Sequence, residues 1–135
     1  MSVFNYEKVK DPQYFRDGRI DAHSDHRYFA SKEAVELDVE EYKESLNGTW
    51  KFHYARNYQQ TIPGFEKEEY CCKSWEDMYV PAHIQMEGYD IPQYTNIPYP
   101  WEGRDDIKPG EIPEHFNPVA SYAKYFEVPE RMAGK

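Results

Sequence analysis

Alternating polar and apolar residues predict one clear β-strand in this chain. It follows Asn47-Gly48, a dipeptide typical of turns. Trp50, Phe52 and Tyr54 then fall on one face, and the polar residues between them fall on the other. This period of two indicates a half-buried strand with three aromatic rings on its core face.

Weaker strand signals lie further along the chain. Residues Ser121–Val128 carry apolar side chains on one face and predict a second strand. Short apolar pieces occur around Tyr79-Val80 and at residues 94–97, separated by prolines and glycines that exclude long central strands. Residues 101–118, punctuated by glycine and proline, predict one long ordered loop.

Only residues 31–44 carry a helix signal. Ser31 is a suitable N-cap, and Glu33 and Glu36 follow near the positive end of the predicted helix. The apolar residues do not form a clean stripe, so we expect a short or broken helix. Residues 2–27 show no sustained period and are expected to form an extended, irregular arm.

The composition favours β-structure over a helical bundle. Leu, Ile, Val and Phe account for only 23 of the 135 residues, a low share that is typical of disordered chains. Aromatic residues, however, make up 17% of the chain, and disordered chains contain few of them. Thirteen tyrosines and ten prolines suit short strands and loops anchored by rings. Two clear and two weak strands are too few for a β-sandwich, which usually has about seven, so we expect part of a larger domain.

The net charge and the cysteines limit which partners the chain can bind and in which cell compartment it functions. The net charge of −9 argues against a nucleic-acid surface, which needs clustered Lys and Arg. The N-terminal stretch lacks the apolar run of a signal peptide or membrane span. Cys71 and Cys72 are adjacent and cannot link distant segments. Reduced thiols and a cytoplasmic location without a membrane partner are therefore expected.

Motifs for catalysis and metal binding are weak. The acidic residues form many pairs, but none follows an evident pocket-forming strand, and no nucleophile triad, phosphate loop or metalloprotease motif is present. In an extended chain Asp21, His23 and Asp25 would share a face suited to a divalent metal, with His26 beside them. The alternative is a solvated turn. We predict no catalytic residue and no metal site.

Residues 80–101 hold the densest chemical feature. Aromatic faces pack on the C–H face of a pyranose, and side-chain amides offer both a donor and an acceptor to sugar hydroxyls. The segment contains both types of side chain: Tyr89, Tyr94, Tyr99 and Trp101 as rings, and Gln85, Gln93 and Asn96 as amides. A sugar-binding loop and a small core filled by rings are the two interpretations.

Four sequence blocks carry a family resemblance. They are RIDAH from Arg19, SLNGTWKFHYA from Ser45, VPAHIQMEGYDIPQYTNIPYPW from Val80 and NPVASYAKYFEVP from Asn117. In this order they resemble the N-terminal part of bacterial β-galactosidases of glycoside hydrolase family 2, over residues 11–130. The resemblance implies a mainly β fold, a partial jelly-roll (galactose-binding-like) β-sandwich with an extended N-terminal arm and one short helix.

The resemblance also implies a domain plan. Residues 1–44 would form the arm with its short helix, and residues 45–135 the first part of the sugar-binding β-sandwich. The catalytic TIM barrel, which holds the two catalytic glutamates of the family, would be absent. The chain would then be the N-terminal fragment of an enzyme that performs retaining hydrolysis of terminal β-D-galactosides, inert alone.

The resemblance assigns two substrate-binding residues, each at a position that matches the family motif. Asn96 matches an asparagine that bonds substrate hydroxyls, and Ile97 matches its apolar neighbour in the pocket. The family places Mg²⁺ near the arm, and Mg²⁺ and Na⁺ would belong to the full-length enzyme. No cofactor is expected in this fragment, because Lys8 falls where a carboxylate ligand would be needed, and Asp11 is therefore assigned no metal role.

The expected partners follow from the same resemblance. They are the galactoside substrate, the remaining domains of the enzyme and further copies of it in a homo-oligomer, since the arm of relatives helps subunits assemble. Two other functions stay open: a free-standing, non-catalytic carbohydrate-binding module, and an assembly fragment that complements a truncated enzyme.

Overall fold

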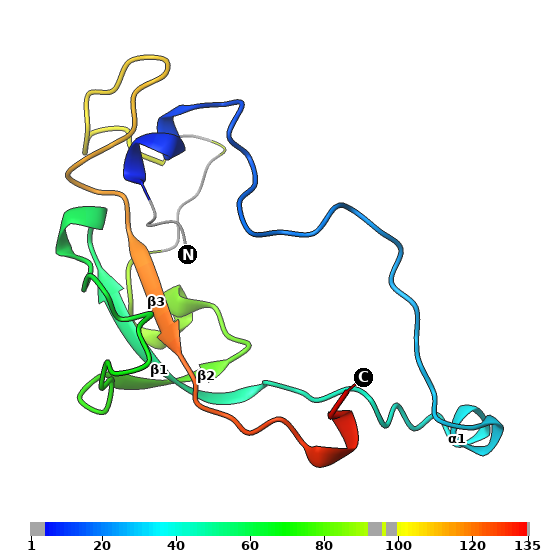
Figure 1. Ribbon diagram of the computed structural model, residues 1–135. Helices are drawn as coiled ribbons and strands as arrows, with labels where there is room; N and C mark the ends of the chain where they lie inside the picture. The colour runs from blue at the N-terminus through cyan, green and yellow to red at the C-terminus, as the bar shows by residue number, and fades with distance from the viewer. Residues whose placement is uncertain (1–4, 92–95, 97–99, 135) are drawn as a thin grey trace. The chain divides into compact units, whose positions relative to one another are not determined.

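The centre of the fold is a three-stranded antiparallel sheet. The computed structural model describes residues 5–91, 96 and 100–134. Its strands are β1 (Gly48–Ala55), β2 (Glu76–Val80) and β3 (Val119–Ala123), in the order β2-β1-β3 (Figure 1). Among these described residues, helical structure is limited to α1 (Lys32–Glu36) and four 3₁₀ segments: Tyr6–Lys10, Tyr58–Gln60, Ile84–Glu87 and Glu130–Met132. The chain is thus mainly β with little helix, consistent with part of a β-sandwich, as the sequence predicted.

The alternation in β1 produces the main core. Phe52 is opposite Glu76 of β2 and Tyr122 of β3, so its strand is paired on both sides. The Phe52 side chain is 1% exposed, and its ring lies 4.6 Å from that of Tyr89 and 5.0 Å from that of Tyr122. The predicted core face of β1 is therefore confirmed, with Phe52 at its most buried point.

The opposite face of β1 is also packed, which the alternation did not predict. Trp75 is only 7% exposed and lies 5.4 Å from the ring of His53, on the face expected to be polar. The rings of Phe65 and Tyr70 surround Trp75, and its indole N–H donates to the Tyr70 hydroxyl at 3.1 Å. The segment before β2 therefore supplies a second, smaller aromatic cluster.

The second predicted strand has the wrong boundaries. The strand expected at Ser121–Val128 is observed at Val119–Ala123, and within the described residues its ladder with β1 ends at the pair Lys51↔Ala123. Phe126 and Val128 are 55% and 66% exposed. A period of two indicates which side chains share a face, but a strand continues only where a neighbouring backbone accepts its hydrogen bonds.

The first part of the arm is not extended throughout, contrary to the expectation for residues 2–27. Tyr6–Lys10 forms a 3₁₀ segment, which Asn5 caps by accepting a 3.0 Å hydrogen bond from the Glu7 N–H. The Tyr6 ring stacks on that of Tyr58 at 4.3 Å. A short 3₁₀ turn leaves no periodic apolar signal, so the pattern could not reveal it.

The chain divides into two compact units. The first contains residues 1–15 and 48–124, and the second contains residues 16–47 and 125–135. Helix α1 belongs to the second unit. The Ser31 hydroxyl accepts a 3.1 Å hydrogen bond from the Ala34 N–H, so both the short helix and its predicted N-cap are confirmed.

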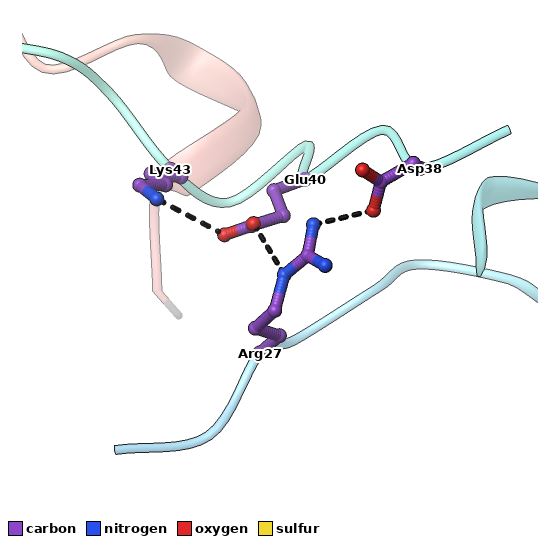
Figure 2. Close-up of polar contacts among 4 residues, drawn as sticks. All are labelled: Arg27, Asp38, Glu40 and Lys43. Atoms are coloured by element: carbon purple, nitrogen blue, oxygen red, sulfur yellow. Dashed lines mark hydrogen bonds and ion pairs between the residues drawn. The ribbon is translucent and has the colours of Figure 1, made fainter.

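Ion pairs hold the chain around α1. Arg27 contacts Asp38 at 2.5 Å and Glu40 at 2.6 Å, and Lys43 lies 3.6 Å from Glu40 (Figure 2). Arg131 donates to the backbone carbonyl of Glu41 at 2.9 Å. Exposed pairs of this kind contribute about 0–1 kcal/mol each to the free energy of unfolding, so they orient this segment more than they stabilise it.

The two cysteines carry free thiols, with Cys71 exposed and Cys72 buried. Among residues 5–91, 96 and 100–134, no helix combines the length and the apolar character needed to cross a membrane.

Truncating Phe52 tests this account of the core. Phe52→Ala should lower the free energy of unfolding by about 3–5 kcal/mol, because it empties a site filled by a large ring. Urea unfolding followed by tryptophan fluorescence measures the change. Phe126→Ala is the matched control, since it makes the same chemical change at a side chain that is 55% exposed. Equal losses for the two variants would contradict the placement of the core.

Candidate functional site

Tyr89 from the aromatic, amide-rich segment packs into the core. The 3₁₀ segment Ile84–Glu87 ends at Gly88, whose φ of 91° is a left-handed conformation that glycine adopts readily. The Tyr89 N–H then donates to the Ile84 carbonyl at 3.1 Å. The Tyr89 ring lies 4.6 Å from Phe52 and 5.9 Å from Tyr54. For Tyr89, the interpretation as a core ring is therefore the one that the structure supports.

The hydroxyl of Tyr89 ties this segment to the sheet. It donates a hydrogen bond to the carboxylate of Glu76, the first residue of β2. This hydrogen bond, together with partial burial and the negative charge of Glu76, raises the pKa of Tyr89 to about 12. Tyr89 is therefore a neutral donor at physiological pH.

Asn96 is the only predicted substrate residue among those that the structure describes. It lies in a turn and is exposed. Ile97 falls outside the described residues, as do Gln93, Tyr94 and Tyr99. The proposed contacts of Asn96 and Ile97 with substrate therefore stay predictions from the resemblance.

An ordered loop follows shortly after Asn96, as the prolines and glycines predicted. Residues 100–111 line an open hollow of about 1010 Å³, with Trp101 half-buried in its wall. The loop starts in a tight turn, where the backbone N–H groups of Arg104 and Asp105 donate to the Trp101 carbonyl at 2.9 and 3.1 Å. A concave surface of this kind is a place where a small ligand can bind.

Asp105 closes this loop. Its side chain is 6% exposed, and its carboxylate accepts a 3.0 Å hydrogen bond from the Phe116 N–H and lies 2.7 Å from Nδ1 of His115. The hydrogen bond with His115 is the main reason that the pKa of Asp105 is lowered; burial opposes it and the Phe116 N–H assists it. Nothing in the sequence distinguished Asp105 from the exposed Asp106 beside it.

The base of the loop is anchored to the end of β1. Phe116 is 6% exposed, with the Arg104 guanidinium 3.8 Å above its ring. The Asn117 N–H donates to the Arg56 carbonyl at 3.1 Å, and the Asn57 amide donates to the His115 carbonyl at 3.3 Å. The sheet therefore positions the loop at its base, while Asp105 closes it.

The polar side chains of Lys8 and Asp11 have hydrogen-bond partners within the N-terminal segment. Mg²⁺ prefers several oxygen ligands in octahedral geometry. The Asp11 carboxylate accepts from the Gln13 N–H at 2.9 Å, and Lys8 places its ammonium group on the Tyr14 hydroxyl, also at 2.9 Å. That the arm holds no metal ion stays a prediction from the sequence.

Residues 21–25 form irregular structure in which the His23 ring makes local contacts. The His23 Nδ1 lies 2.9 Å from the Asp21 carbonyl, and Nε2 lies 3.3 Å from the Asp25 carboxylate. Both ring nitrogens thus have local partners. In the part of the chain that the structure describes, no group of three or more His, Cys, Asp or Glu side chains is placed to hold a metal ion.

Sequence comparison assigns the chain to a family of carbohydrate-active proteins. The sequence profile of the family described as "Glycosyl hydrolases family 2, sugar binding domain" matches residues 43–135. The chain therefore belongs to glycosyl hydrolase family 2 and contains sequence of its sugar-binding domain.

The individual relatives of this chain are β-galactosidases. The chain is 45% identical over 130 residues to a β-galactosidase of Halalkalibacterium halodurans and 44% identical over 129 residues to one of Clostridium acetobutylicum. It is 34% identical over 136 residues to a β-galactosidase large subunit of Latilactobacillus sakei. These alignments cover 96%, 94% and 92% of this chain, but only 13%, 14% and 22% of the respective relatives.

Titration of tyrosine tests the Tyr89–Glu76 contact. We expect one tyrosine to ionise near pH 12, above the usual value of about 10, and Glu76→Gln to move it back toward 10. Because the raised pKa belongs to the folded state, its contribution to stability is present below about pH 10 and is lost as pH rises toward 12. Tyrosinate absorbance measures the shift, with Asp77→Asn as the control. A Tyr89 pKa that Glu76→Gln leaves unchanged would contradict the contact.

Proposed function

We propose that this chain is the N-terminal part of a β-galactosidase that hydrolyses terminal β-D-galactosides with retention of configuration. The observation that carries this proposal is the 45% identity to a β-galactosidase over 96% of the chain. Because the chain spans 13% of that relative, the proposal includes further domains that supply the chemistry. In this proposal the three-stranded sheet is the beginning of a jelly-roll sandwich in a cytoplasmic enzyme.

The chain would contribute binding rather than bond cleavage. Retaining glycosidases use two carboxylates about 5–5.5 Å apart, one as nucleophile and the other as acid and then base. We place both outside this chain, which is therefore expected to be inactive alone. Asn96 would donate to and accept from sugar hydroxyls through its amide, with Ile97 as its apolar neighbour. Such contacts accelerate the reaction where they strengthen in the transition state.

The arm would contribute to assembly of the enzyme. Residues 1–44 carry exposed apolar side chains, including Leu37, which is 74% exposed, and Val35, which is 54% exposed. Exposed apolar residues are common singly, but several on one short segment suit burial against another subunit or domain. We therefore propose that the active form is a homo-oligomer and that the arm contacts neighbouring parts of it.

A chimeric enzyme tests the proposed function directly. This chain would replace the matching segment of the Halalkalibacterium halodurans β-galactosidase, to which it aligns over 130 residues. We expect the chimera to hydrolyse o-nitrophenyl β-D-galactoside and to keep the oligomeric state of the parent enzyme in light scattering. Deletion of the segment is the control. A folded chimera as inactive as the deletion would refute the proposal, whereas galactose binding by the chain alone would favour the carbohydrate-binding module.

Asn96→Ala in the chimera tests the substrate contact. We expect kcat/KM to fall roughly tenfold to a hundredfold, because a hydrogen bond that strengthens in the transition state contributes more than an ordinary one. Gln59→Ala, at another exposed amide, should leave kcat/KM unchanged. Steady-state kinetics at fixed pH gives both values. The same kcat/KM for Asn96→Ala and for the unsubstituted chimera would remove Asn96 from the site.

A further inference from the structure

The loop at residues 100–111 surrounds a hollow that is large enough for a small molecule. Its volume is about 1010 Å³, and every residue that lines it belongs to the loop. Ligand pockets typically measure about 300–1,000 Å³ and combine an apolar wall with a few polar groups. Here the apolar wall includes Trp101 and Ile107, and the polar groups include Asp106 and Lys108. The hollow therefore has the size and the mixed lining of a binding site.

Hydrogen bonds restrain the loop before any ligand binds. The backbone N–H groups of Arg104 and Asp105 donate to the Trp101 carbonyl at 2.9 and 3.1 Å, which fixes the turn that carries the Trp101 side chain. The Asp105 carboxylate in turn accepts from the Phe116 N–H at 3.0 Å. A loop that is restrained in advance loses less conformational entropy when a ligand arrives, so more of the contact energy contributes to affinity.

The side chain of Trp101 differs from those of the other two tryptophans. Trp75 donates its indole N–H to the Tyr70 hydroxyl at 3.1 Å, and Trp50 packs edge-on against the Tyr122 ring with 6.4 Å between the ring centroids. Among the residues that the structure describes, the Trp101 indole N–H has no hydrogen-bond acceptor, and its ring has no aromatic or cationic partner. The half-buried Trp101 ring is therefore available to a ligand in the hollow that it lines.

The lining of the hollow favours a neutral ligand that is rich in hydroxyl groups. Residues 100–111 include four acidic and two basic side chains, an excess of negative charge that disfavours phosphates and carboxylates. One of the two cations, Arg104, lies 3.8 Å above the Phe116 ring. An indole ring presents a flat apolar face and one N–H donor, which match the C–H face and the hydroxyls of a pyranose. The Asp106 carboxylate can accept hydrogen bonds from further hydroxyls.

We propose that the hollow at residues 100–111 receives a pyranose ring of the galactoside substrate and that Trp101 stacks on the apolar face of that ring. The inference rests on the proposed function, which supplies the galactoside. Trp101 then binds the substrate without taking part in bond cleavage. Its loss should raise KM and leave kcat nearly unchanged, because the stacking contact is equally strong in the ground state and in the transition state.

Substitution of Trp101 in the chimeric enzyme tests this contact by steady-state kinetics. We expect Trp101→Ala to raise KM for lactose by roughly threefold to tenfold, with kcat within about twofold of the unsubstituted chimera. Trp101→Leu keeps an apolar side chain in the wall but removes the flat ring, so it should raise KM to a similar extent. Trp101→Phe keeps a ring and should raise KM less. Tyr79→Ala is the matched control, since it removes a ring that is 64% exposed on β2 and lies outside the hollow.

Two substrates identify the ring that Trp101 contacts. Lactose has two sugar rings, whereas o-nitrophenyl β-D-galactoside has one. A rise in KM for both substrates would place the galactosyl ring in the hollow, and a rise for lactose alone would place the second sugar there. Either result supports the proposal, because both put a pyranose on Trp101.

The remaining outcomes separate this inference from the function on which it rests. An active chimera whose KM for both substrates is unchanged in Trp101→Ala and in Trp101→Leu would overturn the contact and leave the proposed function intact. A KM that rises in Trp101→Ala but not in Trp101→Leu would also overturn it, because the side chain would then only fill the wall. If Trp101→Ala does not fold, the folded Trp101→Leu variant decides. A folded but inactive unsubstituted chimera would refute the proposed function and this inference together.

Discussion

The described fold depends on the pairing of β1 on both sides. A strand with two neighbours has its backbone groups satisfied within the sheet, so side chains on either face can be buried without leaving backbone N–H and C=O groups unpaired. Phe52 lies in the part of β1 where both ladders overlap, opposite Glu76 and Tyr122. The packing of Tyr89 on one face and of the Trp75 cluster near His53 on the other follows from this central position.

The sequence predicted the parts of the fold that local chemistry determines. The alternation of β1 and the cap at Ser31 each depend on a few neighbouring residues, and both are confirmed. The end of β3 and the burial of Trp75 could not be predicted in this way. The first depends on where a partner strand stops, and the second depends on a segment more than twenty residues away folding over His53.

The site shows the same division between local and distant causes. The family resemblance assigned Asn96 to substrate binding, and the closely spaced prolines and glycines predicted the loop that follows. The sequence could not reveal the roles of Asp105 and Tyr89, because each is defined by partners ten or more residues away along the chain. Their pKa values move in opposite directions for one reason: the Asp105 carboxylate receives hydrogen bonds, whereas the Tyr89 hydroxyl gives one to a carboxylate.

The two-sided packing of β1 has a consequence for how this chain tolerates changes in length. Side chains alternate between faces, so one residue inserted between Gly48 and Phe52 would either shift the ladder with β2 or turn Phe52 toward the cluster of Trp75. Neither face has room for the side chains moved onto it, because each is already filled by rings. In the loop after Trp101 an added residue would cost little closure entropy, provided that Asp105 still reached Phe116. Insertions and deletions among homologues should therefore gather in that loop and avoid β1.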